Sequence, residues 1–505
     1  MTIATVPGDA HDARLIGRTR PLDWVNPDPA PRYNLVVIGG GTAGLVTAVG
    51  AAGLGAKVAL IEREQLGGDC LNVGCVPSKA LVRTARAAAQ VRDAARFGVR
   101  VPDGWRVDFP AVMERMRRIR ADLSPPDSAE RLKGLGIDVF FGAGRFSGPD
   151  AIEVGGKTLR FQRAVLATGA RAHRPNTPGL AEAGFLTNET VFALTALPTR
   201  LAVIGAGPIG CELAQIFARL GSEVALLGNR SQLLPKEDRE AAERIEKALR
   251  RDGIAIDLGC EVTRVEVRGA DKILHLASGG TTWELAVDEI LVGAGRMPNV
   301  DGLNLEGIGV AFDPHDGATV DDRLRTTNAR VYAAGDVCSK YKFTHAADAM
   351  ARIVIRNALF KGRSKASALT VPWCTYTDPE IAHVGMAEHE AEERGIAYRA
   401  FTQELNGVDR AVLDGEDEGF VKILVHPKKD TILGATIVAS HAGEMISEIT
   451  LAMVGKLGLG TIAKTIHPYP TQCEAIKKIG DTYNRTRLTP KVKWLFEKWL
   501  NWSRR

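Results

Sequence analysis

Two segments of the chain share one local pattern, and this repetition constrains the fold more than any other feature. In the first segment an apolar run at 34–38 leads into Gly39, Gly41 and Gly44, then into small helix-forming residues and a second apolar run that ends on Glu62. In a strand–turn–helix unit, the first glycine makes the turn, the second lets a pyrophosphate approach the backbone, and the third lets helix and strand pack closely. Glu62 follows at the distance where a carboxylate accepts hydrogen bonds from ribose. The segment therefore predicts a dinucleotide-binding unit.

The same pattern returns in the middle of the chain. An apolar run at 201–204 precedes Gly205, Gly207 and Gly210. A chain with two such units is expected to bind two dinucleotides, which indicates FAD in one unit and a nicotinamide cofactor in the other. The repeated pattern predicts an α/β fold with two Rossmann-like domains.

The second unit differs from the first at the end of its second strand. Gly228, Asn229 and Arg230 stand where the first unit has Glu62. No carboxylate is present there to bind a free ribose 2′-hydroxyl, whereas Arg230 can meet a 2′-phosphate. The sequence therefore favours NADPH over NADH.

Cys70 and Cys75 lie between these units, with four residues between them. A zinc site usually adds a second pair of ligands, and we find none in the sequence, so no metal site is expected. A structural disulfide would be unusual in a chain with no export signal and seven cysteines in 505 residues. A redox-active disulfide is the favoured interpretation, and two buried apolar thiols are the alternative. A helix that begins near Cys70 would stabilise a thiolate there.

Composition excludes several classes of function. The net charge of +5 is small for a chain of this length and does not indicate a nucleic-acid partner. There is no apolar run of 18 residues and no signal-peptide pattern, so we expect a cytoplasmic protein. Residues 1–32 are polar and carry several prolines, which predicts an extended arm that lies on the surface or frays.

The motifs together resemble the class I FAD-containing pyridine nucleotide–disulfide oxidoreductases, which include glutathione reductase, dihydrolipoyl dehydrogenase and mercuric reductase. The resemblance runs from about residue 33 to residue 482 and includes three further segments in the family's order. It assigns four residues of these segments to the FAD site, the last of them as a contact of the flavin ribitol: Thr168, Gly169, Arg296 and Asp336.

The resemblance also assigns roles in electron transfer. Cys75 would face the flavin and form a charge-transfer thiolate, while Cys70 would exchange with the outside substrate. Lys79, one helical turn after Cys75, resembles the lysine near the reactive nitrogen of the flavin, with Glu212 as its partner. A lysine and a glutamate near the start of a helix are also common surface residues, and that interpretation is the alternative.

The resemblance implies an order of domains and a C-terminal α+β dimerisation domain, through which each subunit of a homodimer completes the active site of the other. The expected parts are an N-terminal arm at 1–32, a discontinuous FAD-binding domain at 33–170 and 295–365, an NAD(P)-binding domain at 171–294, the dimerisation domain at 366–483, and a basic amphipathic tail at 484–505.

The expected catalytic segment of the dimerisation domain departs from the family pattern. Glutathione reductase and dihydrolipoyl dehydrogenase have His-Pro-Thr-x-x-Glu, and aligning its end on Glu474 puts Tyr469 in the place of the acid–base histidine. His467 lies two residues earlier, on the same side of an extended segment but about 7 Å away. Cys473 is either a small buried residue or a third thiol near the partner's redox pair.

These features predict an enzyme that passes electrons from NAD(P)H through FAD and the Cys70–Cys75 disulfide to an acceptor. Tyrosine in the histidine's place resembles mercuric reductase, although no cysteine follows Cys473, so the metal-delivery cysteines of that enzyme have no counterpart here. The acceptor, a small molecule or a metal ion, stays open. The alternatives are a dihydrolipoyl dehydrogenase or another disulfide reductase, and a flavin-bearing redox sensor with little turnover.

The tail beyond the resemblance is basic and amphipathic. Apolar residues including Leu495, Phe496 and Trp499 fall on one face of a helix, and Lys491 and Lys498 fall elsewhere. Such a helix can bind an anionic membrane surface or dock on its own dimer.

Overall fold

The computed structural model describes residues 8–504, which form two compact units. The first unit contains the described residues up to Asn229 together with Ile254–Leu369, and the second contains Arg230–Gly253 and the chain from Thr370 onward. Among the described residues, no helix is both long enough and apolar enough to cross a membrane.

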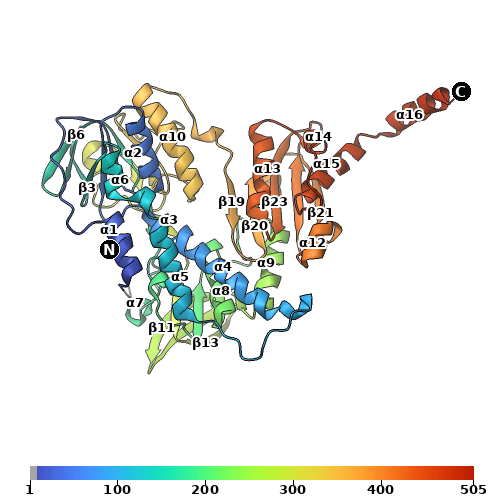
Figure 1. Cartoon of the computed structure of the whole chain (residues 1–505), viewed down its shortest axis with the longest axis horizontal. Coiled ribbons are helices and arrows are strands. Elements are labelled where there is room, and N and C mark those ends of the chain that lie inside the picture. Colours follow the sequence, from blue (N-terminus) through green and yellow to red (C-terminus); the bar gives the residue numbers. More distant parts are fainter. Residues whose placement is uncertain (1–7, 505) are drawn as a thin grey trace. The chain divides into compact units, whose positions relative to one another are not determined.

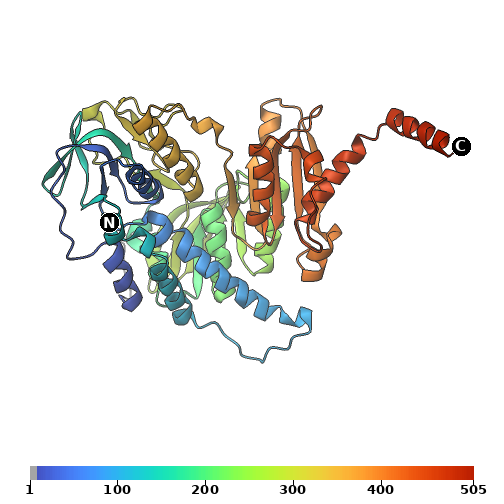
Figure 2. The same ribbon diagram turned by 45° about the horizontal axis from the view of Figure 1, so that its top comes forward.

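The first unit holds a seven-stranded sheet around the first glycine pattern (Figure 1). Its central strands are parallel, and they are apolar and buried because helices and loops cover both faces. In sheet order the strands are β3 (Asp138–Phe141), β2 (Val58–Glu62), β1 (Tyr33–Ile38), β6 (Lys157–Leu166), β5 (Ala151–Val154) and β4 (Arg145–Gly148), with β18 (Val331–Ala333) also paired to β6. Helices α2 (Thr42–Gly53) and α10 (Thr344–Phe360) pack side by side on this sheet (Figure 2).

A second, four-stranded parallel sheet follows the second glycine pattern in the same unit. Its order is β10 (Ala255–Leu258), β9 (Glu223–Gly228), β8 (Arg200–Ile204) and β14 (Glu289–Val292). Helix α8 (Pro208–Leu220) leaves the glycine turn after β8 and is almost wholly buried. An antiparallel sheet of β11 (Glu261–Arg268), β12 (Asp271–Ser278) and β13 (Thr281–Val287) completes this part. The two Rossmann-like sheets confirm the predicted fold class.

Three helices link the two sheets within the first unit. Short helix α3 (Gly68–Asn72) is followed directly by α4 (Cys75–Arg92), which packs against α5 (Phe109–Asp122) and against α8. Because α8 begins at the second glycine pattern and α3 follows the first, this packing places the cysteine pair beside both nucleotide-binding patterns.

The N-terminal region was predicted to be extended, and this prediction was wrong for residues 10–19. They form helix α1 (Ala10–Thr19), which begins at Asp9 because that side chain accepts hydrogen bonds from the amides of His11 and Asp12. Residues beyond α1 do run in an extended course along β3, where Asn26 exchanges two hydrogen bonds of 2.8 and 2.9 Å with the backbone of Phe141. Residues 1–7 of the predicted arm lie outside the described residues.

The second unit is built on a five-stranded antiparallel sheet. Its order is β19 (Pro372–Thr375), β20 (Glu380–Gly385), β23 (Ile432–Ala439), β22 (Phe420–Val425) and β21 (Arg399–Glu404). Helices α13 (Ala442–Val454) and α15 (Glu474–Thr486) pack on the sheet, and α9 (Arg239–Arg251) also contacts it. Lys422 of β22 lies among Asp238, Glu240 and Glu388 at 2.9–3.1 Å, which fixes the start of α9 to this sheet.

Candidate active site

Cys70 and Cys75 lie near the starts of two consecutive helices. Cys70 lies in α3 and Cys75 is the first residue of α4. Glycines make this tight course possible: a Cβ at Gly74 would stand 2.7 Å from the carbonyl oxygen of Asp69, and a Cβ at Gly68 would stand 2.6 Å from the Cα of Gly41. The cysteine loop is therefore packed directly on the first glycine turn.

The pKa values of the two thiols are shifted in opposite directions. A hydrogen bond from Cys70 lowers the pKa of Cys75 to about 6, against the opposing effect of burial, and Thr344 and Lys79 lower it further. The Sγ of Cys75 lies 3.5 Å from the Oγ1 of Thr344. The pKa of Cys70 is raised by the same hydrogen bond to Cys75 and by burial. Although a helix does begin near Cys70, the thiolate of the reduced pair belongs at Cys75, at the start of the longer helix.

Lys79 and Glu212 form an ion pair beside the thiols. The Nζ of Lys79 donates to the Oε2 of Glu212 at 2.7 Å. Lys79 lies on α4, one turn after Cys75, and the buried Glu212 lies on α8. The structure thus brings together Cys70, Cys75, Lys79 and Glu212, as their predicted roles require, and these roles stay a prediction.

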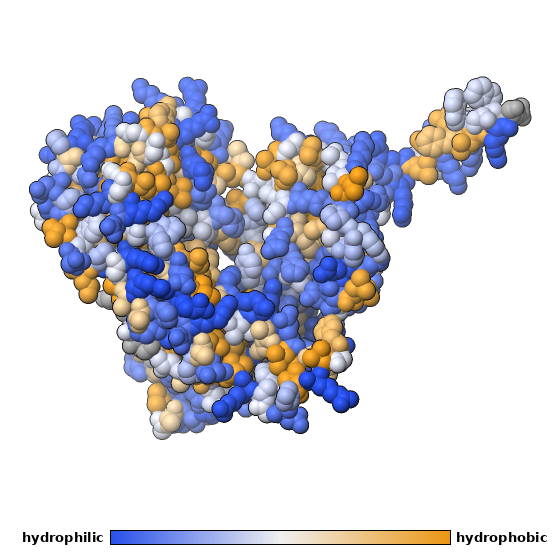
Figure 3. Space-filling model, viewed as in Figure 1, coloured by the Kyte–Doolittle hydropathy of each residue, from blue (hydrophilic) through white to orange (hydrophobic). Residues whose placement is uncertain are grey.

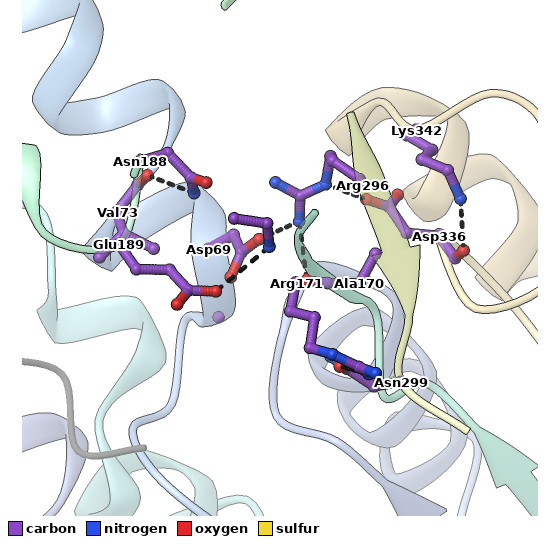
Figure 4. Close-up of polar contacts among 12 residues, drawn as sticks. Asp69, Val73, Ala170, Arg171, Asn188, Glu189, Arg296, Asn299, Asp336 and Lys342 are labelled. Carbon is purple, nitrogen blue, oxygen red and sulfur yellow. Dashed lines mark hydrogen bonds and ion pairs between the residues drawn. The ribbon is translucent and has the colours of Figure 1, made fainter. Parts of the chain in front are cut away.

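Arg296 connects the cysteine loop to the end of β18 (Figure 4). Its guanidinium group binds Asp69, the residue before Cys70, donates to the carbonyl of Ala170 at 2.8 Å, and lies 3.4 Å from Asp336. Burial tends to lower the pKa of Arg296, but the two carboxylates outweigh it and raise it. Burial raises the pKa of Asp336, although Arg296 and Lys342 oppose this shift. The arginine therefore stays charged and holds two acidic residues in place.

Thr168 and Gly169 are tied to the returning segment near Arg296. The Oγ1 of Thr168 donates to the backbone carbonyl of Asn299 at 2.7 Å, and the backbone N–H of Asn299 donates to the carbonyl of Gly169 at 3.0 Å. These contacts join the two places where the chain leaves and re-enters the first Rossmann-like domain.

The first glycine turn fits a dinucleotide. Packing within the protein explains two of its glycines, since a Cβ would stand 2.3 Å from the Ala167 oxygen at Gly39 and 1.7 Å from the Gly39 oxygen at Gly44. Gly41 differs, because the nearest atom to its Cβ would be 3.6 Å away. The protein itself does not require a glycine there, and the free space fits the approach of a pyrophosphate.

Glu62 lies buried at the end of β2 beside this turn. Its Oε2 accepts from the amide of Gly40 at 2.6 Å, and its Oε1 accepts from the amide of Glu64 at 2.6 Å. Burial raises the pKa of Glu62 against the effect of these hydrogen bonds. The carboxyl group is thus fixed where the first dinucleotide-binding pattern would hold a ribose.

The second glycine turn repeats this arrangement. A Cβ at Gly205 would meet the Gly293 oxygen at 2.6 Å and a Cβ at Gly210 would meet the Gly205 oxygen at 1.8 Å, whereas nothing lies within 4 Å of one at Gly207. The space above Gly207 fits a second pyrophosphate. β9 ends at Gly228 without a carboxylate, and Arg230, two residues later, is exposed.

The segment from His467 to Glu474 lies in the second unit, where its polar side chains have separate partners. The Nε2 of His467 lies 3.0 Å from Glu448 of α13, and this histidine side chain is only 6 % exposed. The hydroxyl of Tyr469 donates to Asp409 at 2.7 Å, which raises the pKa of Tyr469. The Oε2 of Glu474 is buried, and no described residue offers it a hydrogen bond.

Cys473 precedes Glu474 and packs against the core of the second unit. Burial raises the pKa of its thiol. This environment favours the neutral thiol and agrees with the interpretation of Cys473 as a small buried residue.

Sequence reasoning missed a network that supports the cysteine loop from α1. Arg120 of α5 donates to Asp12 of α1 at 2.7 Å and to the carbonyl of Asn72, at the end of α3, at 2.9 Å. Leu15 of α1 packs with Leu71, the neighbour of Cys70. The N-cap signal of Asp9 could have revealed the helix, but nothing local to Asp12 or Arg120 indicates their pairing.

One further cluster of possible metal ligands appears among the described residues. Glu266, His275 and Glu284 meet on the surface of the β11–β13 sheet. Arg268 already pairs with both glutamates, so its guanidinium group neutralises the charge that would attract a cation.

Comparison with protein-family models identifies both halves of the chain. Residues 33–351 match the model "Pyridine nucleotide-disulphide oxidoreductase", and residues 371–479 match the dimerisation domain of the same family. The second match supports a homodimer.

Similar proteins include two kinds of enzyme. A mercuric reductase of Bacillus cereus is 34 % identical over 479 residues, which cover 95 % of this chain and 76 % of the relative. A dihydrolipoyl dehydrogenase of Thermus scotoductus is 34 % identical over 470 residues, which cover 90 % of this chain and 98 % of the relative.

Solved structures of similar fold include LpdA from Mycobacterium tuberculosis, with a TM-score of 0.82, 27 % identity and coverage of 90 % of this chain and all of that one. They also include the HOCl-induced flavoprotein disulfide reductase RclA from Escherichia coli as a Cu(II) complex, with a TM-score of 0.79, 28 % identity and the same coverage. The chain belongs to the pyridine nucleotide–disulphide oxidoreductases, a family of NAD(P)H-dependent FAD enzymes with a redox-active disulfide.

Proposed function

We propose that this enzyme reduces a thiophilic metal ion, as a mercuric-reductase-like member of its family, rather than a disulfide substrate. The observation that carries the proposal is the environment of Tyr469, which occupies the aligned position of the acid–base histidine and whose hydroxyl donates a hydrogen bond to Asp409. The mercuric reductase relatives agree with a metal acceptor, and the disulfide reductase RclA forms a Cu(II) complex.

The pKa of Tyr469 explains why this residue matters. A disulfide substrate releases a thiolate, and a group that titrates near neutral pH speeds this step by protonating it. Tyrosine has an unperturbed pKa of about 10, and the hydrogen bond to Asp409 raises it further. A metal ion that takes electrons from thiolates leaves no thiolate to protonate, so this substrate does not need the missing acid.

Glu474 supports the same interpretation. In the family pattern its carboxylate belongs to the acid–base histidine, and here its Oε2 is buried with no hydrogen-bond partner among residues 8–504. The other oxygen of Glu474 lies 3.7 Å from the Nζ of Lys478, so the carboxylate faces a lysine and not an acid–base histidine.

The residues of the cysteine loop suit a soft metal ion. Cys75, with a pKa of about 6, is a thiolate at neutral pH and can coordinate a metal directly, while Cys70 becomes a thiolate by losing its proton on coordination. When the two thiolates return to the disulfide, they give up two electrons, which reduce one Hg(II) ion to Hg(0) or two Cu(II) ions to Cu(I). Lys79 and Glu212 keep a balanced charge pair beside the loop.

Bound FAD would supply the link between the nicotinamide and the disulfide by accepting a hydride and passing on two electrons. Gly39, Gly41, Gly44 and Glu62 would hold its adenine half, and Arg296 and Asp336 lie beside the cysteine loop through the contact of Arg296 with Asp69.

The preferred reductant in this proposal is NADPH. It rests on Gly228 and Arg230 at the end of β9, and one charge contact with a 2′-phosphate is worth about 1–3 kcal/mol, or roughly tenfold to a hundredfold. Stopped-flow reduction of the flavin by each cofactor tests this preference. Faster reduction and tighter binding with NADH would refute it.

The dimer would complete the site in the proposed enzyme. Apolar side chains of the dimerisation domain stand exposed in the single chain, among them Leu451 at 68 %, Val454 at 61 % and Ile466 at 93 %. Ile466 is the neighbour of His467, so a partner that covers it would also approach this segment.

A dihydrolipoyl dehydrogenase is the second candidate, and the His467–Glu448 pair favours it. A histidine that contacts a carboxylate at 3.0 Å can act as a general acid–base group. His467 does so, although it lies two residues before the aligned position of the family's catalytic histidine. In this case His467 would protonate the leaving thiolate.

An acceptor panel on three proteins separates the two candidates. Wild type, Tyr469→His and His467→Gln are each assayed with NADPH and with Hg(II), Cu(II), a quinone, lipoamide and glutathione disulfide. We expect wild type to reduce the metal ions and to turn over the disulfides poorly, and Tyr469→His to raise disulfide turnover by up to about 10²–10⁴-fold. Rapid lipoamide turnover by wild type that is lost in His467→Gln would refute the proposal and establish the second candidate.

A further inference from the structure

The C-terminal helix of the chain buries no residue against the rest of residues 8–504. Helix α16 (Pro490–Ser503) begins at Thr489, whose side chain accepts from the amide of Val492, and Pro490 follows as its first residue. These signals start a helix without help from tertiary contacts. None of its residues is buried.

The exposed side chains of α16 separate into two faces. At 100° per residue, one face gathers apolar side chains, of which the first is half-buried and the others are exposed: Val492, Leu495, Phe496, Trp499, Leu500 and Trp502. Three lysines lie toward the other face, where the Nζ of Lys498 stands 3.9 Å from the ring centroid of the exposed Trp494. Figure 3 shows apolar and hydrophilic side chains together on this helix.

The charge of the segment is strongly positive. Residues 484–505 contain seven lysines and arginines and one acid, Glu497, whereas the whole chain has a net charge of only +5. The positive charge of the protein is therefore concentrated at this end, beside the apolar face of α16.

We propose that α16 binds the surface of an anionic lipid membrane and lies in its plane, with the apolar face inserted among the acyl chains and the lysines against the headgroups. This goes beyond the proposed reaction and does not depend on it. With 14 residues the helix is too short to span a bilayer, which needs about 20.

Two observations favour a lipid surface over a second copy of the helix. Pairing two α16 helices would bring two basic segments together, and like charges repel, whereas an anionic surface complements them. The apolar face also carries Trp499 and Trp502, and tryptophan concentrates at the membrane–water boundary because its ring is apolar and its N–H is polar.

Sedimentation with vesicles tests the proposal on the full-length FAD-loaded enzyme. We expect binding to vesicles that contain phosphatidylglycerol, little binding to phosphatidylcholine alone, and weaker binding at high salt. Leu495→Glu combined with Trp499→Glu should abolish binding without changing NADPH oxidation. Leu54→Glu is the matched control, because Leu54 is 61 % exposed and Leu495 is 56 % exposed, and it should bind like wild type.

A charge variant provides an independent measurement. Replacing Lys491, Lys493 and Lys498 by glutamine should weaken binding by about fivefold per residue, or roughly a hundredfold in total. Absence of binding to anionic vesicles, equal binding to both kinds of vesicle, or unchanged binding in the Leu495→Glu/Trp499→Glu variant would each overturn the proposal. A change of oligomeric state in that variant would also overturn it, since α16 would then dock on its own dimer.

Discussion

Removing the carboxylate of Asp12 should loosen the cysteine loop from a distance, because Asp12 neutralises a buried arginine. Asp12 is 1 % exposed and Arg120 is 4 % exposed, and their side chains meet at 2.7 Å. Arg120 also donates to the carbonyl of Asn72, which ends α3. In the variant Asp12→Ala, the guanidinium group is left buried without its carboxylate partner, at a cost of about 3–5 kcal/mol.

Asp122→Ala is the matched control in the same pair of helices. Asp122 pairs with Arg14 at 2.6 Å, but the two side chains are 49 % and 39 % exposed. An exposed pair contributes only about 0–1 kcal/mol, because water solvates both charges when the pair is broken. The two variants remove the same group from the contact between α1 and α5 and differ in burial.

Hydrogen exchange read by mass spectrometry is the suitable assay, because it reports local opening, and a chain of several domains is not expected to unfold in one two-state step. The expected cost corresponds to roughly 10²–10⁴-fold faster exchange in Asp12→Ala, both in α1 and in peptides that contain Asn72. Asp122→Ala should change exchange by less than about tenfold. Equal effects of the two variants, or an effect of Asp12→Ala confined to α1, would refute the reasoning.

Two further predictions concern the thiols and the glycine turns. In the reduced enzyme, the thiolate absorbance that depends on Cys75 should appear with a midpoint near pH 6 as the pH rises, because the lowered pKa keeps the deprotonated form above that value. Cys70→Ala should move this midpoint upward, since the hydrogen bond from Cys70 is the largest cause of the shift, and an unchanged midpoint would contradict this cause. Gly207→Ala should fold normally but bind the nicotinamide cofactor more weakly. Gly210→Ala should instead lower the melting temperature, because only at Gly210 would the added Cβ meet protein, 1.8 Å from the Gly205 oxygen. Equal melting temperatures for these two variants would contradict the assignment.

The parts of the site that could be predicted from sequence are those whose geometry is local. The glycines at 39, 41 and 44 act through turns and close approaches within one strand–turn–helix unit, so their spacing alone indicates the fold. Cys70, Cys75 and Lys79 likewise lie within one continuous segment, and the structure brings them together as that spacing requires.

The partners of these residues could not be predicted in the same way. Glu448 and Asp409 reach His467 and Tyr469 from other elements, and no sequence spacing marks such contacts. Helix α1 was not predicted because its polar residues and the prolines after it suggested an exposed arm. Its burial depends on a single apolar residue, Leu15, and on one ion pair.

The central claim, that electrons from the nicotinamide reach the pair Cys70 and Cys75, is tested most directly by mapping thiols during reduction. The oxidised enzyme is titrated anaerobically with NADPH and treated with an alkylating reagent, and each of its seven cysteines is located by mass spectrometry. We expect one equivalent of NADPH to make Cys70 and Cys75 newly reactive and to leave the labelling of the other cysteines unchanged. New labelling at Cys473 or at any other cysteine, or no new label at all while the flavin is reduced, would contradict it.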